Sequence, residues 1–136
     1  ASADVSHMAL FKERLTLISP LGHRRIKGPQ DVAGDSVIAF PSGCAYRRRL
    51  YQWLGDTRIA TTRALDLGSY HAIVACVGAG AGIALVPESV LDTLPLAQVM
   101  RHPLPRQHAD IVTPLISRTQ EQSAALVALR EQLKDR

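Results

Sequence analysis

Aromatic residues, cysteines and long apolar runs are all scarce in this 136-residue chain. One Trp, three Tyr and two Phe, none interleaved with a basic patch, cannot form the stacking platform that binds single-stranded nucleic acid. The two cysteines, Cys44 and Cys76, lie in no metal-binding or redox spacing, so they indicate neither zinc nor secretion. No stretch approaches the roughly 18 apolar residues that cross a bilayer, and residues 1–8 lack a signal-peptide layout. We therefore expect a cytoplasmic protein that does not contact membranes.

Charge of one sign is limited as well. Sixteen Lys and Arg against twelve Asp and Glu give a net charge of +4, a modest excess for binding a polyanion. The dense basic run is Arg47-Arg48-Arg49, and three successive helical residues fan over most of a turn instead of forming one stripe. We expect these arginines to form a solvated helix face.

The composition, 46% hydrophobic and 21% charged, is that of a folded domain. Short apolar runs alternate with helical-period segments, and this order predicts an α/β sheet with right-handed crossovers. In the first strand we expect Phe11, Leu15 and Leu17 on one face and polar residues largely on the other. The expected strands cover 10–18, 36–40, 58–65, 82–87, 96–102 and 111–117; the expected helices cover 44–54, 69 to the glycines at 78–82, 88–94, and 119 or 120 to 133; loops cover 21–34 and 103–107.

The glycine-rich run from Gly78 to Gly82 resembles a dinucleotide-binding fingerprint only superficially. That fingerprint needs a strand before the glycines and a helix after them, whereas here a helix precedes and a strand follows. We expect these glycines to shape the backbone between helix and strand.

Catalytic and metal-binding patterns are missing. There is no GxSxG motif beside Ser42, Cys44 or Ser69, and no local feature marks one of the five histidines as a base. His71 and Cys76 are five residues apart on a helix, a poor spacing for a metal pair. We expect no catalytic residue, no metal and no cofactor.

Two helix starts are expected at one edge of the sheet. Ser42-Gly43 follows one strand and opens a helix, and Gly68-Ser69 follows the next strand and opens another. Free backbone N–H groups, the helix dipole and serine hydroxyls together suit a carboxylate or another anion, and this carboxyl edge is where α/β sheets usually bind ligands. The alternative, with equal weight, is that both serines only cap their helices.

Three segments resemble the effector domain of LysR-type transcriptional regulators. The first, Leu10-Phe-Lys-Glu-Arg-Leu-Thr-Leu-Ile-Ser-Pro-Leu-Gly-His23, resembles that family's crossing strand and Pro-x-Gly-His turn. The second, Val37-Ile-Ala-Phe-Pro-Ser-Gly43 with Arg47 and Trp53-Leu54, resembles the strand, ligand loop and helix that begin the second lobe. The most specific, Val74-Ala-Cys-Val-Gly-Ala-Gly-Ala-Gly-Ile-Ala-Leu-Val-Pro87, is similar to the family's VaaGlGialvP segment. Together they extend the resemblance over about Leu10 to Leu133.

The resemblance implies the type 2 periplasmic-binding-protein fold, in which two α/β lobes joined by crossover strands hold an effector between them. Residues 10–136 would be a fragment of such an effector-binding domain, and residues 1–9 a linker or a cut end. About 20–110 would form the Rossmann-like second lobe, 10–19 and 111–118 the crossover strands, and 119–136 a C-terminal helix of the first lobe. The winged helix-turn-helix and most of the first lobe would lie outside this sequence.

The same resemblance implies the ligand-binding residues. By position, Ser42, Gly43, Cys44, Ala45 and Tyr46 match the second-lobe ligand loop, and Ser69 matches the start of the following helix. The ligand would be a small, anionic metabolite. Ala45 stands where some relatives carry a Thr hydroxyl, so the identity of the effector stays open.

The intact protein would then be a homo-oligomeric transcription factor whose lobes close on the metabolite. DNA would be bound only through the helix-turn-helix domain, which this chain lacks. The apolar face of the last helix, including Leu126 and Leu133, would lose part of its cover and promote self-association. The alternatives are a stand-alone solute-binding protein of the same fold and a small α/β enzyme.

Overall fold

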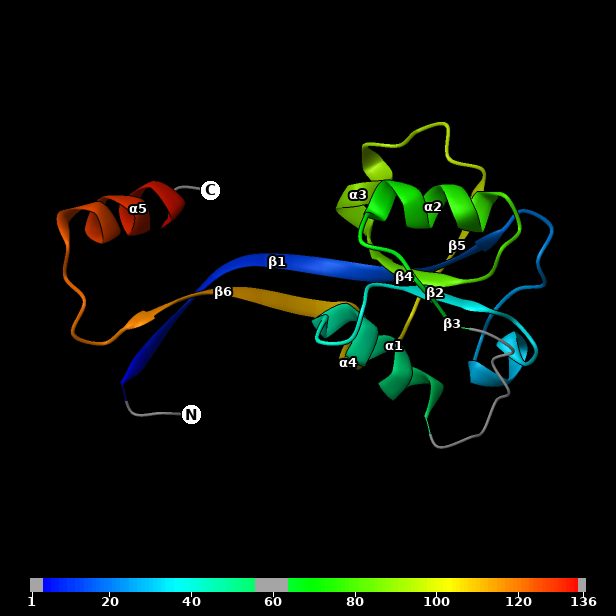
Figure 1. The fold of residues 1–136 in the computed structure, drawn as a ribbon, viewed down its shortest axis with the longest axis horizontal. Coiled ribbons are helices and arrows are strands. Elements are labelled where there is room, and N and C mark those ends of the chain that lie inside the picture. The colour runs from blue at the N-terminus through cyan, green and yellow to red at the C-terminus, as the bar shows by residue number, and fades with distance from the viewer. Residues whose placement is uncertain (1–3, 56–63, 135–136) are drawn as a thin grey trace. The chain divides into compact units, whose positions relative to one another are not determined.

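The computed structural model describes residues 4–55 and 64–134. The chain divides into two units (Figure 1). Unit 2 is Arg14–Asp110, and unit 1 combines Ala1–Glu13 with Ile111–Arg136. The elements are β1 (Val5–Pro20), η1 (Pro29–Val32), β2 (Val37–Ala39), α1 (Ala45–Leu54), β3 (Ala64–Asp66), α2 (Tyr70–Gly78), β4 (Ala84–Pro87), α3 (Glu88–Asp92), β5 (Val99–His102), α4 (Arg106–Ala109), β6 (Asp110–Arg118) and α5 (Ala124–Lys134). This order confirms the predicted α/β class.

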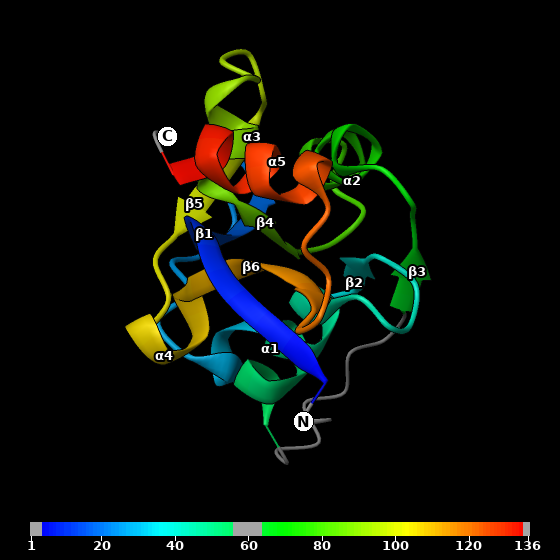
Figure 2. The ribbon, with the colours of Figure 1, turned by 90° about the vertical axis from the view of Figure 1, so that its left-hand side faces the viewer.

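Two groups of strands meet in unit 2. β1 lies between β4 and β5 and is antiparallel to both. β2 and β3, seen near each other in Figure 2, run parallel. A parallel bridge between Val37 and Ile83, just before β4, joins the groups, and the Ile38 N–H donates to the Ile83 carbonyl over 2.8 Å. Because β2, β3 and the start of β4 share one direction, their carboxyl ends lie at the same edge.

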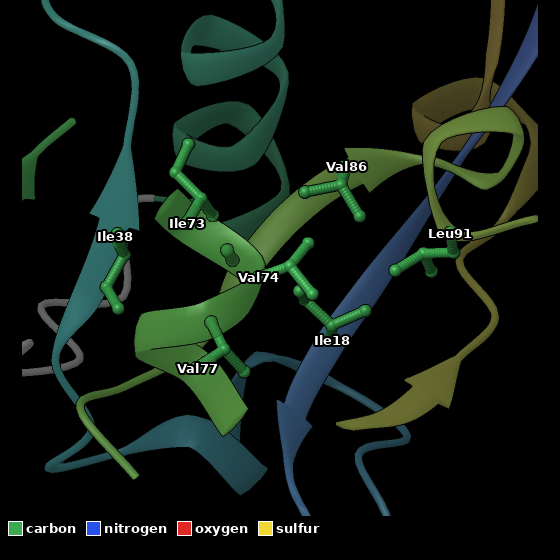
Figure 3. Packing of buried hydrophobic residues seen from close by; sticks show 8 residues of the cluster. Ile18, Ile38, Ile73, Val74, Val77, Val86 and Leu91 are labelled. Carbon is green, nitrogen blue, oxygen red and sulfur yellow. The ribbon is translucent and has the colours of Figure 1, made fainter. Parts of the chain in front are cut away.

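A hydrophobic core lies between α2 and these strands. Ile73, Val74 and Val77 of α2 belong to one buried cluster with Ile18 of β1 and Ile38 of β2 (Figure 3). The buried residues of α2 are Ile73, Val74 and Val77, and Cys76 is half-buried. The continuous apolar run of β2 is buried at all three residues, which is typical of a strand covered on both faces.

The pattern expected for β1 is wrong in its second half. Leu15, Thr16, Leu17, Ile18 and Ser19 are all buried, so this stretch has no solvent-facing side. The reason is its central place between β4 and β5, because both faces of an inner strand are covered by neighbouring elements. Of the three residues expected to share a face, Leu15 and Leu17 are buried, whereas Phe11 is 42% exposed.

The helix ends follow local signals. α1 buries Leu50, Trp53 and Leu54 and ends at Gly55, whose φ of 70° a side chain would strain. α2 begins after Ser69, as predicted. The expected loop at 103–107 instead contains the start of α4, a single turn that the sequence pattern did not reveal. Residues 58–63 of the predicted third strand lie outside the described residues, and β3 is described from Ala64.

Unit 1 pairs the two ends of the chain. β6 lies beside β1, and the Thr119 N–H donates to the Asp4 carbonyl over 2.8 Å. This pairing explains why β1 begins at Val5 and not at Leu10, since cross-strand bonds order residues that have no strand periodicity of their own. α5 begins at Ala124, later than predicted, because the Ser123 hydroxyl accepts the Leu126 N–H as a cap.

The apolar face of α5 is open within the described residues. The helix buries none of its residues, and Val127 and Leu129 are 41% and 45% exposed. Arg130 fixes the helix to the strands, because its guanidinium donates to the Ser117 hydroxyl over 2.6 Å. Leu126 and Leu133 are half-buried, so the self-association expected from this face stays a prediction.

Candidate functional site

The two predicted helix starts lie at the same edge of unit 2. β2 and β3 are parallel neighbours, with Ala39 opposite Asp66, and the Leu67 N–H donates to the Ala39 carbonyl over 2.9 Å. Ser42 follows the carboxyl end of β2, and Ser69 follows the carboxyl end of β3. The geometric requirement for a shared site is therefore met.

Each helix start presents backbone N–H groups. The Ser69 hydroxyl accepts the Ala72 N–H over 3.4 Å and caps α2. Cys44 is the N-cap residue of α1 but gives no side-chain cap, so its side chain satisfies none of the N–H groups in the first turn of that helix. Gly43, with φ of 100°, makes the turn between β2 and α1, and both Ser42 and Ala45 are exposed beside it.

Aromatic side chains bring the two turns together. Tyr70 at the start of α2 packs edge-on against Phe40 at the end of β2, with ring centroids 4.7 Å apart. The ring of Tyr46, in the first turn of α1, lies 6.3 Å from that of Tyr70. Of the predicted ligand residues, Tyr46 is thus the one that links the α1 turn to the α2 turn.

An ion pair also ties these elements. The Arg47 guanidinium donates to the Asp66 carboxylate over 2.5 Å and to the Phe40 carbonyl over 2.9 Å. It also lies over the Tyr51 ring, 5.3 Å from its centroid. The Asp66 carboxylate raises the pKa of Arg47 above its ordinary value, so the pair stays charged. The expectation of a fully solvated arginine face is wrong for Arg47, whose side chain is only 21% exposed.

Removing the Arg47 contacts should loosen the α1 turn. Arg47→Met keeps an apolar stem but loses both hydrogen bonds, and we expect a loss of about 1 kcal/mol, because Asp66 is half-exposed and solvent weakens the pair. Urea unfolding followed by the fluorescence of Trp53 measures this. Arg48→Met is the matched control, since Arg48 is exposed, and should change the free energy of unfolding by less than about 0.5 kcal/mol. Equal losses in both variants would contradict this role of Arg47.

Sequence reasoning missed three residues at this edge as site residues, namely Phe40, Asp66 and Tyr70. Each lies within a residue or two of a predicted strand end or helix start. The sequence did contain a signal for the ion pair. Asp66 ends one parallel strand, and Arg47 lies in the first turn of the helix that follows the neighbouring strand. Parallel strands bring such positions together.

The structure also locates the glycine run and the two cysteines considered in the sequence. α2 ends at Gly78 and β4 begins at Ala84, so the glycine run lies after a helix and before a strand, as expected. Gly80 adopts φ of 90° in this turn. Cys44 and Cys76 are free thiols, and the described residues contain no group of three His, Cys, Asp or Glu side chains placed to hold a metal. None of the helices in the described part of the chain is both long and apolar enough to span a membrane.

Comparison with known sequences points to one family. The model of the LysR substrate binding domain matches residues 1–136. The HTH-type transcriptional regulator GltR of Bacillus subtilis (strain 168) is 31% identical over 88 residues, which are 65% of this chain and 30% of GltR. The regulator CzcR of the same strain is 32% identical over 105 residues, covering 76% of this chain and 35% of CzcR. The chain thus spans about a third of the length of these relatives.

Solved structures share the fold. The effector binding domain of QuiR in complex with shikimate superposes with a TM-score of 0.79 at 20% identity, over 98% of this chain and 66% of that one. The regulatory domain of MetR from N. meningitidis, a LysR family regulator, gives 0.78 at 17% identity, over 98% and 64% of the two chains. At these identities the likeness establishes the fold alone.

Proposed function

Because the chain belongs to the LysR substrate binding domain family, we propose that it senses a small, anionic metabolite for a bacterial transcriptional regulator. The observation that carries this proposal is the common edge of the two helix starts, at Ser42 and at Ser69. Two helix N-termini at one edge offer N–H donors and positive dipole ends to a carboxylate. Sensing requires no bond to be made or broken, so we infer that the domain is not an enzyme.

The proposed ligand contacts divide into backbone and side-chain donors. Gly43 and Ala45 would offer backbone N–H groups at the start of α1, and the Ser42 hydroxyl would add a donor beside them. Cys44, whose N–H donates to the Pro41 carbonyl over 3.4 Å, would line the turn between them. The Ser69 oxygen accepts the Ala72 N–H and keeps its own proton free to donate to an anion. Tyr46 would contribute an aromatic wall next to Tyr70. Arg47 is already paired with Asp66, so attraction of the anion would depend on these neutral donors.

The remaining assignments follow the family. We propose that about 20–110 form the second lobe, 10–19 and 111–118 the crossover strands, and 119–136 a helix of the first lobe. The whole regulator would be a cytoplasmic homo-oligomer that binds DNA through a helix-turn-helix domain. Binding of the metabolite would shift the population between two DNA-bound arrangements. A solute-binding protein or a small enzyme is not favoured, since the relatives GltR and CzcR are transcriptional regulators.

A carboxylate panel tests the site. QuiR was solved with shikimate, whose carboxylate is the kind of group that this edge would hold, so shikimate and other small carboxylates form the first panel. Calorimetric titration should find a ligand whose affinity falls about tenfold or more in Ser69→Ala, because a hydrogen bond to a charged group is lost.

Ser123→Ala is the matched control for this experiment. Ser123 also caps a helix through its hydroxyl, but in unit 1. Both substitutions should lower the free energy of unfolding by about 1 kcal/mol, and only Ser69→Ala should weaken binding. If Ser69→Ala binds the ligand as tightly as the parent chain, the serine is only a cap and the proposed site is wrong.

A further inference from the structure

A buried histidine holds the segment between β1 and β2 against the sheet. His102, the last residue of β5, is 2% exposed. Its Nδ1 lies 3.2 Å from the backbone nitrogen of Ile26, and its Nε2 lies 2.7 Å from the Ser19 hydroxyl oxygen. The Ile26 side chain is itself 4% exposed, so this contact pins an apolar anchor of the segment.

The hydrogen-bond partners fix the protonation state of His102. A backbone N–H can only donate, so Nδ1 must accept the Ile26 N–H and carry no proton. The single ring proton is therefore on Nε2 and is donated to the Ser19 oxygen, whose own hydroxyl donates to the Pro20 carbonyl over 3.2 Å. The contact with Ile26 exists only while the imidazole is neutral.

A second histidine, His23, lies beside His102 and has different hydrogen-bond partners. The Nδ1 of His23 is 2.7 Å from the Arg24 carbonyl oxygen, and its Nε2 is 2.7 Å from the Asp35 carboxylate. Both partners are oxygen acceptors, so each ring nitrogen of His23 faces an oxygen. The two rings meet edge-on, with centroids 6.3 Å apart.

The surroundings oppose a positive charge on His102. Burial lowers the pKa of His102, and His23 and Arg25 lower it further by charge repulsion. The neighbours on β1 are neutral: Ser19 is described above, and the Thr16 hydroxyl donates to the His102 carbonyl over 3.2 Å. On β5 itself, Arg101 pairs with Asp92 at 3.3 Å. Among the described residues, the groups in contact with the ring include no carboxylate that would stabilise an added proton.

We propose that His102 and Ile26 form an acid-sensitive latch, in which protonation of Nδ1 replaces the acceptor of the Ile26 N–H with a donor and releases residues 21–35 from the sheet. A histidine that binds its proton less readily in the folded chain stabilises the fold fully above the unfolded pKa of 6.5, and this contribution is lost as the pH falls through the lower folded value. The latch is thus closed near neutral pH and opens in mild acid.

The segment keeps its own turn when the latch opens. The Asp31 carboxylate accepts the N–H groups of Lys27 and Gly28 over 2.8 and 3.1 Å. These backbone bonds lower the pKa of Asp31 below its ordinary 3.8. These bonds lie within residues 27–31, so the segment leaves the sheet as a folded turn. Because it leads directly into β2, the release acts on the strand that carries Ser42.

Amide hydrogen exchange of Ile26, followed by NMR on the 136-residue chain, tests the latch. After correction for the intrinsic exchange rate, the protection of this amide should fall by up to about tenfold for each pH unit between 6.5 and the lower folded pKa of His102, as one added proton requires. In His102→Asn, the amide oxygen can accept the Ile26 N–H but does not titrate, so this fall should be absent. His71→Asn replaces an exposed histidine of the same unit and should leave the fall unchanged.

A second variant keeps the test decisive if His102→Asn does not fold. His23→Gln removes the histidine whose repulsion lowers the pKa of His102, so the midpoint of the Ile26 transition should move to higher pH. Protection of Ile26 that stays constant between about pH 7.5 and about pH 5 in the parent chain would overturn the proposal. A midpoint that His23→Gln leaves in place would overturn it as well.

Discussion

Gly82→Ala is expected to destabilise unit 2 by about 3 kcal/mol, the upper range of the cost of overpacking. A Cβ atom at Gly82 would lie 2.3 Å from the Ser36 carbonyl oxygen and 2.9 Å from its carbon. That oxygen accepts the Ile83 N–H over 2.9 Å, so the clash falls on the junction between β2 and β4. Backbone atoms cannot rotate away as a flexible side chain can. Urea unfolding followed by the fluorescence of the single Trp, Trp53, measures the loss.

Alanine substitutions at two other glycines distinguish steric overlap from backbone strain. Gly80→Ala meets no atom within 4 Å but must adopt φ of 90°, so it should cost about 1 to 2 kcal/mol through backbone strain alone. Gly68→Ala meets neither obstacle and should change the free energy of unfolding by less than about 0.5 kcal/mol. If Gly82→Ala is no less stable than Gly80→Ala, the close approach to Ser36 is not what makes Gly82 necessary.

Local signals in the sequence predicted the elements that surround the site. The apolar run at Val37–Ala39 marked a buried strand, Gly55 marked the end of α1, and Ser69 marked the start of α2. Each signal depends on a residue and its immediate neighbours, because capping, glycine conformations and apolar runs are short-range effects. The common edge of Ser42 and Ser69 then followed from parallel pairing, which the alternation of strands and helices implied.

Features that depend on distant partners were not predictable in this way. Val5 joins β1 because β6, more than a hundred residues later, supplies its hydrogen bonds. Thr16 and Ser19 are buried because their polar groups find partners at His102. In a single sequence nothing marks such pairs, since the contact exists only once the chain has folded.

The candidate site also contains both kinds of feature, those set by local signals and those set by distant partners. The positions of Ser42, Gly43 and Ser69 could be inferred from turn and cap residues. The pairing of Arg47 with Asp66, and the packing of Phe40 on Tyr70, needed the relative placement of two strands and two helices. The fan of the three arginines around the helix predicts a solvated face, and nothing local marks Asp66 as the partner of Arg47, because the two are 19 residues apart in sequence.

Ile38→Ala should cause the largest loss of stability, about 4 kcal/mol, near the upper end for deletions that leave a core cavity. Ile38 is fully buried in β2 and faces Ile73 and Val77 of α2 (Figure 3). The strand backbone on one side and the helix on the other are each held by further contacts, so neither can move in to fill the space. Since domains are stable by only about 5 to 15 kcal/mol, chemical unfolding should detect this change readily.

Graded variants tell whether packing at Ile38 is the cause. Ile38→Val removes one methylene and should cost about 1 kcal/mol, a quarter of the loss on truncation to Ala. Leu96→Ala deletes a comparable side chain that is 86% exposed, so it should change stability by less than about 0.5 kcal/mol. Should Ile38→Ala match Leu96→Ala, the contact between β2 and α2 would not be close-packed, and the edge that holds Ser42 beside Ser69 would lack a rigid support. The expected order of losses, with Ile38→Ala largest and Leu96→Ala smallest, would instead indicate that close packing of this core holds the two helix starts at a fixed spacing.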